Sequence, residues 1–240
     1  MLNAILKKAI KDIAIYLPGR LLPALTGLIT IPIFARLFQP AEYGILAVVG
    51  VFTAAGGVVV GNWLTSSVMR FLPYYRNAEQ LDRFYSSLFF AFGLSIIGLG
   101  ILGLPIYVLI KKTISSEVYR LMPLAGLIIV TSSLYAILQT ILRSDQRSKL
   151  FVASELFLNY GGLTLGLTLV LIFHFGVDGI LWGSLMVTIL LCVTIVRFLL
   201  SRGIKVGASN VSILILKEFA LYGLPSCLAT IGTWLLSVSD

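Results

Sequence analysis

Long apolar stretches, separated by short polar or basic segments, recur along this sequence. A membrane core about 30 Å thick needs about 20 apolar residues in a helix. Because an isolated strand would leave its backbone groups unpaired in lipid, each such stretch is predicted to be a helix. Seven stretches qualify, at residues 13–35, 44–69, 86–110, 121–142, 150–173, 179–196 and 219–238. The sequence therefore predicts an all-α, polytopic bundle of about seven transmembrane helices.

The composition indicates that lipid is the main solvent of this chain. Hydrophobic residues make up 58% of the 240 positions and charged residues 12%, whereas soluble domains carry about 25% charge. The net charge of +8 comes from basic residues that lie mainly between the apolar stretches. That distribution points to an anionic membrane surface, so membrane lipid and not nucleic acid is the predicted partner.

The basic residues also predict an orientation. With the N-terminus in the cytoplasm, 13 of the 18 Lys and Arg residues fall in cytoplasmic segments, 4 fall in outer segments, and Arg20 lies inside the first span. Cytoplasmic loops of membrane proteins carry an excess of Lys and Arg. We therefore expect a cytoplasmic N-terminus.

A short repeat suggests how the chain is divided. The segments from Ala14 to Pro18 and from Ala220 to Pro225 each combine Ala, a branched apolar residue, Tyr and Pro at the start of a span. Six spans lie between the two starts, so both repeats enter the membrane in the same direction, as parallel transporter repeats do. We expect residues 1–206 to form a six-helix lobe. Residues 207–240 would then be a linker and the first helix of a truncated second lobe.

Motifs for catalysis or metal binding are absent from the sequence. It has one histidine, His174, and two cysteines, Cys192 and Cys227, each inside an apolar run. It contains neither a G-x-x-x-x-G-K-[ST] phosphate loop nor an H-E-x-x-H motif. We expect no catalytic residues, metal or cofactor, and a protein that is not an enzyme.

Arg20 is the most informative polar residue because it lies seven residues into the first span, about 10 Å deep. Burying such a cation in lipid costs at least about 2.5 kcal/mol, so it is expected to face a bundle interior or a wet cavity. Tyr16 shares its helical face, and Glu155 enters the fifth span at a similar depth. Three interpretations stay open: Arg20 pairs with Glu155, binds an anionic group, or extends to the cytoplasmic interface.

Further polar side chains lie inside the predicted spans. Asn62, Tyr135, Gln139 and Asn159 carry groups that hydrogen-bond or stack on sugars. The same residue types also join helices, and for each one singly helix packing is the favoured interpretation. With this alternative open, the candidate substrate-binding residues are Arg20, Tyr16, Asn62, Tyr135, Gln139, Asn159 and Glu155.

Small residues recur at the spacing that lets helices approach closely. The pairs are Gly57 and Gly61, Gly162 and Gly166, and Gly179 and Gly183. Ordinary helix packing is the favoured interpretation, and sliding of helices during gating is the alternative.

Three segments resemble the bacterial polysaccharide flippases, the Wzx-like exporters of O-antigen and exopolysaccharide. Residues 31–44, IPIFARLFQPAEYG, are similar to their first loop, and residues 68–73, VMRFLP, are similar to the next. Residues 222–240, from YGLP through WLLSVSD, resemble the start of their second lobe. These exporters belong to the multidrug/oligosaccharidyl-lipid/polysaccharide transporter superfamily.

The resemblance implies two six-helix lobes around a central cavity in the bacterial inner membrane. It implies a substrate of oligosaccharide linked through pyrophosphate to a polyprenol, flipped from the cytoplasmic to the outer face by alternating access. Polysaccharide polymerase and other assembly proteins would be its partners. Arg20 is then the candidate for the pyrophosphate, since its fork of donors matches phosphate oxygens.

Two other functions compete with a flippase. A MATE-type antiporter of drugs or cations resembles the same superfamily, but it would need acidic groups deep in this lobe. The deep charge here is Arg20, which favours an anionic substrate. A non-transporting membrane scaffold of a polysaccharide assembly complex is the third class.

Overall fold

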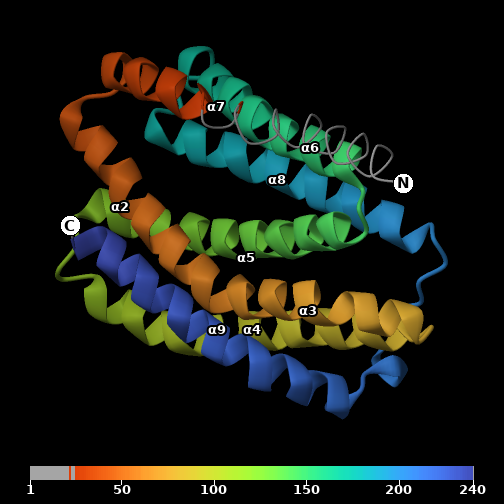
Figure 1. The fold of residues 1–240 in the computed structure, drawn as a ribbon. Coiled ribbons are helices and arrows are strands. Elements are labelled where there is room, and N and C mark those ends of the chain that lie inside the picture. The colour runs from red at the N-terminus through yellow and green to blue at the C-terminus, as the bar shows by residue number, and fades with distance from the viewer. Residues whose placement is uncertain (1–21, 23–24, 240) are drawn as a thin grey trace. The chain divides into compact units, whose positions relative to one another are not determined.

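Helices and the short turns between them make up the part of the chain that the computed structural model describes, residue 22 and residues 25–239 (Figure 1). The α-helices are Leu25–Leu37, α2 (Pro40–Gly57), α3 (Trp63–Asn77), α4 (Leu81–Ile110), α5 (Ser116–Ser144), α6 (Ser148–Leu156), α7 (Gly162–Leu171), α8 (Val177–Leu200) and α9 (Ile213–Ser239). No strand occurs in the described residues. The predicted all-α class is confirmed.

Two of these spans contain a π-helical segment. The segment η1 (Val58–Asn62) joins α2 to α3, and η2 (Phe157–Gly161) joins α6 to α7, in each case without a break in the helix. A π turn closes its hydrogen bonds over five residues and often marks a functional site.

Six continuous helices are long and apolar enough to cross a membrane. They are Pro40–Asn77, Leu81–Ile110, Ser116–Ser144, Ser148–Leu171, Val177–Leu200 and Ile213–Thr230. The shorter apolar helix Leu25–Leu37 is the described part of the first predicted span. Six of the predicted spans therefore coincide with a long helix, the first does so in residues 25–35, and the chain is a multi-pass membrane protein.

The helices form two compact units. Unit 1 combines the chain up to Ala47 with Asp145–Leu191, and unit 2 combines Val48–Ser144 with Cys192–Asp240. The expected division into lobes at residue 206, and the parallel repeat behind it, stay predictions.

Unit 2 is built around α3, which contacts α4, α5 and α9; α3 and α9 lie side by side in Figure 1. Apolar side chains from all four helices are almost fully buried in its core: Leu64, Val68, Leu72, Phe84, Leu88, Ile137, Leu138, Ile141, Ile215 and Phe219. The rings of Phe84 and Phe219 meet edge to face at 5.4 Å. Packing of this kind fixes the start of α9 against α3 and α4.

Backbone N–H groups of the segment before α9 donate hydrogen bonds to side chains at the start of α4. Lys205 N–H donates to Asp82 Oδ1 at 2.9 Å, and Gly207 N–H donates to Ser86 Oγ at 3.1 Å. Ser212 N–H donates to Ser87 Oγ at 2.9 Å.

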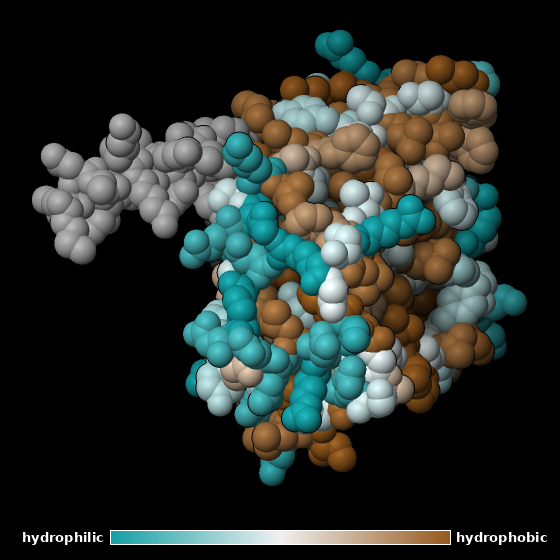
Figure 2. Space-filling model, turned by 90° about the vertical axis from the view of Figure 1, so that its right-hand side faces the viewer, coloured by the Kyte–Doolittle hydropathy of each residue, from teal (hydrophilic) through white to brown (hydrophobic). Residues whose placement is uncertain are grey.

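The face turned to the viewer in Figure 2 shows hydrophilic side chains gathered among hydrophobic ones.

In unit 1, α7 and α8 pack through glycines. A Cβ on Gly183 would overlap the backbone of Gly166, and one on Gly162 would lie 3.7 Å from Ser184 Cα. A Cβ on Gly179 would lie 3.2 Å from Leu169 Cβ. The two predicted glycine pairs in this part of the chain are therefore confirmed as sites of close helix packing.

The third predicted pair is wrong by one residue. A Cβ on Gly57 would meet nothing within 4 Å, whereas one on Gly56 would overlap the side chain of Ile129 in α5. Gly61 also faces α5, where its Cβ would lie 3.1 Å from Ser133 Cβ. The reason is η1: a π turn brings residues five apart onto one face, so Gly56 and not Gly57 pairs with Gly61.

Candidate functional site

The first two candidates, Tyr16 and Arg20, lie outside the described residues. Leu22, two residues after Arg20 in the sequence, is described, and its carbonyl oxygen accepts a hydrogen bond from Tyr160 Oη at 3.1 Å. Tyr160 belongs to η2, five residues after Glu155. Within unit 1 the chain near Arg20 is therefore bonded to the span that contains Glu155.

Glu155 and Asn159 are brought together in unit 1. Asn159 Nδ2 donates to the backbone carbonyl of Glu155 at 2.8 Å, and both side chains are half-buried. The segment η2, which contains Asn159, separates Glu155 from Gly162 and Gly166, and these two glycines pack on α8.

Tyr160 is a polar residue of this region that the sequence reasoning missed. Its ring lies in the π segment beside Asn159, and its hydroxyl reaches the first helix. Two consecutive turns thus carry a carboxylate, an amide and a phenol. The only signal in the sequence was another tyrosine inside a span.

Tyr135 and Gln139 form the second pair, one turn apart on α5 in unit 2. The side-chain amide of Gln139 donates to Tyr135 Oη, and each residue is only 5% exposed. Because hydrogen bonds gain strength where water is excluded, this pair is held in a defined orientation. At this exposure the pair lies inside the packed core of unit 2, and its role in substrate binding stays a prediction.

Asn62 has a different role, because it joins η1 to α9. Its Nδ2 donates to Thr230 Oγ1 at 2.8 Å, and one turn further Ser66 Oγ lies 2.9 Å from Ser226 Oγ. Cys227 Sγ is 3.4 Å from the carbonyl oxygen of Val58 in the same π segment. The favoured interpretation of Asn62 as a helix-packing residue fits this geometry.

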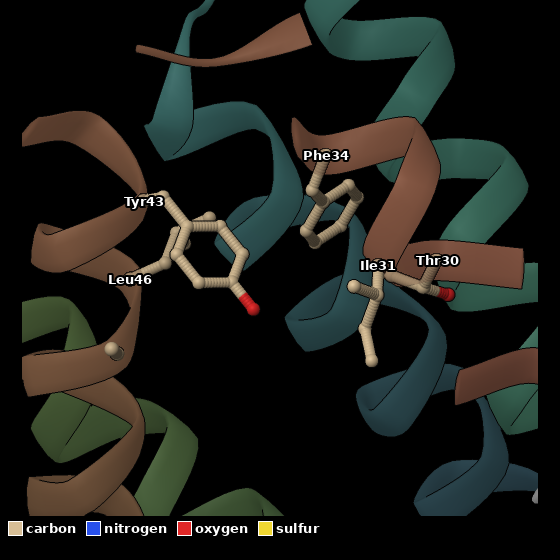
Figure 3. Close-up of a pocket in the computed structure, with 6 residues that line it drawn as sticks. Thr30, Ile31, Phe34, Tyr43 and Leu46 are labelled. Carbon is tan, nitrogen blue, oxygen red and sulfur yellow. The ribbon is translucent and has the colours of Figure 1, made fainter. Parts of the chain in front are cut away.

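A pocket of about 320 Å³ in unit 1 lies between Leu25–Leu37 and the first turns of α2 (Figure 3). Phe34, Ile31 and Leu46 line it, and the hydroxyl of Tyr43 points into it. Thr30 Oγ1 is bonded to the carbonyl of Thr26 at 2.7 Å. This mainly apolar pocket contains none of the predicted residues and offers little to a sugar.

The described part of the chain contains no group of three or more His, Cys, Asp or Glu side chains that could hold a metal ion. The predicted candidates comprise neutral hydrogen-bonding groups, one carboxylate and the arginine of the first span.

A protein family model matches most of this sequence. The family model described as polysaccharide biosynthesis protein matches residues 33–240. No curated protein sequence matches the chain.

Solved structures share the fold at low sequence identity. A MOP superfamily transporter from Pyrococcus furiosus Vc1, whose binding pocket of reverse polarity suggests a different function, is 19% identical with a TM-score of 0.63. It aligns over 92% of this chain and 51% of its own. A multidrug resistance MATE family transporter in an outward-facing conformation is 18% identical with a TM-score of 0.67, over 93% and 52%. This chain thus spans about half the length of these structures.

Proposed function

This chain belongs to the family of polysaccharide biosynthesis proteins, and we propose on that premise that it forms half of a membrane transporter. Its substrate is an oligosaccharide linked through pyrophosphate to a polyprenol. The transporter moves the sugar from the cytoplasmic to the outer face of the inner membrane, with the N-terminus in the cytoplasm. The family match over residues 33–240 carries this proposal.

The polar residues of the two units support a sugar substrate. Tyr135 with Gln139, and Asn159 beside Glu155, place phenol and amide groups within apolar spans. Such groups bind hydroxyls without a strong charge preference. Arg20 supplies the one deep cation of the predicted first span, and we assign it to the pyrophosphate, with Tyr16 on the same helical face.

The MATE-type antiporter is the second candidate, and the shared fold is the observation that favours it. The fold alone does not separate the two, because one superfamily fold serves different substrates. A cation exporter would use Glu155 as its binding carboxylate. In a flippase, Glu155 would instead orient or neutralise Arg20. The first candidate binds an anionic substrate and the second a cationic one, so the charge of the transported substrate separates them. The scaffold class predicts no transport of either kind.

The test is transport by the full gene product containing this chain, reconstituted in liposomes. Fluorescent lipid-linked oligosaccharide should cross the bilayer, and Asn159→Ala should slow it at least about tenfold if one substrate hydrogen bond of about 1.5 kcal/mol is lost. Thr164→Ala, an exposed hydroxyl on the same span, is the matched control. Proton-coupled efflux of an organic cation without flipping would support the antiporter instead.

A further inference from the structure

A pocket of about 530 Å³ lies in unit 2 where α3 ends and α9 begins. Charged, polar and aromatic side chains from α3, α9 and the turn before α4 line it: Arg70, Phe71, Tyr74, Tyr75, Gln80 and Glu218. None of them belongs to the candidate substrate site. Its mixed lining distinguishes this pocket from the apolar surfaces that lipid chains cover.

Arg70 is held in this pocket by aromatic rings. Its guanidinium lies 4.3 Å from the ring centroid of Tyr222 and 5.6 Å from that of Phe71. Stacking over a ring face leaves the in-plane N–H donors available. Among the described residues, no carboxylate oxygen lies within 4.0 Å of this cation. Arg70 thus presents a positive charge and a fork of donors that matches phosphate oxygens.

Glu218 supplies the opposite charge from α9. One of its oxygens, Oε2, accepts a hydrogen bond from Tyr75 Oη at 2.7 Å. Tyr75 itself is 4% exposed, with its ring against those of Tyr74 and Phe84 at 5.2 and 5.5 Å. A buried phenol therefore orients this carboxylate. Because this donor is neutral, it does not compensate the negative charge of Glu218, and the described residues show no further hydrogen bond or ion pair to this side chain.

Two opposite charges that line one pocket without forming an ion pair are a recognition pattern for a zwitterion. A bound molecule with a phosphate and an ammonium group would compensate both charges at once. The adjoining ring of Tyr74, which is 66% exposed, adds an aromatic face for the ammonium. An anion alone would be repelled by Glu218, and a cation alone by Arg70.

The predicted spans place this pocket near the depth of lipid headgroups, since Arg70 follows the span 44–69 and Glu218 precedes the span 219–238. Arg70 is seven residues before the end of α3 at Asn77, which is about 10 Å along the helix axis. The interfacial layer adds about 5–8 Å on each side of the apolar core, and long basic side chains extend toward it. Exposed Leu214 and Leu221 on α9 offer apolar surface beside it for acyl chains.

We propose that Arg70 and Glu218 bind the headgroup of a phosphatidylethanolamine-type phospholipid between α3 and α9. The phosphate lies on the Arg70 guanidinium, and the primary ammonium donates to Glu218. A choline headgroup has no N–H to donate, so the site prefers ethanolamine to choline. The proposal does not depend on which substrate the protein transports.

The test is lipid binding by the purified full chain, measured by native mass spectrometry with phosphatidylethanolamine, phosphatidylcholine and phosphatidylglycerol of equal chain length. The wild type should bind the ethanolamine lipid at least about tenfold more tightly than the choline lipid, as expected when one charge-assisted hydrogen bond is absent. Glu218→Gln keeps an acceptor for Tyr75 and should abolish that preference. Arg70→Gln should weaken binding of all three lipids.

Matched controls are Lys217→Gln, which neighbours Glu218 in sequence, and Arg83→Gln on α4; both side chains lie outside the pocket. Both should bind lipid like the wild type. If Arg70→Gln does not fold, Arg70→Lys tests the same contact by keeping the charge without the fork. Equal binding of ethanolamine and choline lipids by the wild type, or an ethanolamine preference that survives Glu218→Gln, would overturn the proposal. The proposal would also be overturned if glycerophosphoethanolamine, which has the headgroup but no acyl chains, bound as tightly as the lipid.

Discussion

The backbone of α9 at Gly223 lies directly against the backbone carbonyl of Trp63 in α3. A Cβ on Gly223 would overlap that oxygen and lie 2.8 Å from Ser67 Oγ. Because Trp63 contributes main-chain atoms, which cannot rotate away, only a residue without a side chain fits at this crossing. The glycine of the Tyr222–Pro225 segment therefore has a packing role.

Gly223→Ala should destabilise the protein by about 1–3 kcal/mol, the usual cost of overpacking a tight contact. Gly232→Ala on the same helix is the control, since a Cβ there would meet nothing within 4 Å. Unfolding in detergent, followed by circular dichroism, would compare the two. Equal stability of both variants would contradict the close approach of α9 to α3.

The π segment η1 gives a second prediction. The Cβ of Gly61→Ala would press on Ser133 in α5, which should cost about 1 kcal/mol of unfolding free energy. Gly57→Ala should cost nothing, and it should gain some helix propensity. In a regular α-helix, Gly57 would share the packing face of Gly61, and Gly57→Ala would then also destabilise the protein. The comparison of the two variants thus tests the register of the span.

The spans were predictable because lipid imposes a length and an apolar composition on every crossing helix. The helical register inside each span was not predictable, since residues 58–62 and 157–161 carry no sequence pattern that indicates a π turn. Each π turn shifts the following residues relative to the preceding ones, which is why Gly57 was assigned to the wrong face. Hydropathy averaged over a stretch of residues predicts where a span lies. The helical register inside the span depends on the hydrogen-bond pattern of each turn.

The candidate site was predictable only as a set of residue types. Periodicity placed Tyr135 and Gln139 on one face of a helix, and the structure joins them by a hydrogen bond. Periodicity gave no information on Asn62, because its partner Thr230 lies 168 residues away in the sequence. Partners on distant helices follow from tertiary packing, so the sequence left Tyr75 with Glu218 undetected as well.

Asn62 and Thr230 should behave as a coupled pair. A double-mutant cycle of Asn62→Ala and Thr230→Ala should give a coupling free energy of about 0.6 kcal/mol, and at most about 1.7 kcal/mol, as for hydrogen bonds between membrane helices. Unfolding free energies in detergent supply the four corners of the cycle. Zero coupling, together with loss of substrate affinity in Asn62→Ala alone, would return Asn62 to the substrate site.

The topology yields a labelling prediction. Gln39 lies between Leu37 and Pro40, and Asn77 ends α3; both are exposed. In intact cells, after permeabilising any outer membrane, an impermeant thiol reagent should label the variant Gln39→Cys and not Asn77→Cys. The native Cys192 and Cys227 are buried and give a low background. The opposite labelling pattern would invert the predicted orientation.

Arg20 gives the last prediction, for the full gene product containing this chain. Arg20→Ala should abolish transport while membrane insertion persists, because removing a deep cation lowers the cost of insertion. Arg20→Lys should retain part of the activity, since it keeps the charge but loses the bidentate fork. The bond from Tyr160 to Leu22 supports placing this segment near the span of Glu155.

A purely structural role for Arg20 makes a different prediction. If Arg20 only pairs with Glu155, Arg20→Ala strands a carboxylate in the membrane and lowers the amount of folded protein. Adding Glu155→Gln removes the stranded charge and should then restore both folding and transport. If Arg20 binds pyrophosphate, the double variant is folded and still inactive. Transport per folded molecule in the single and double variants decides between the roles, and wild-type transport by Arg20→Ala would exclude Arg20 from the substrate site.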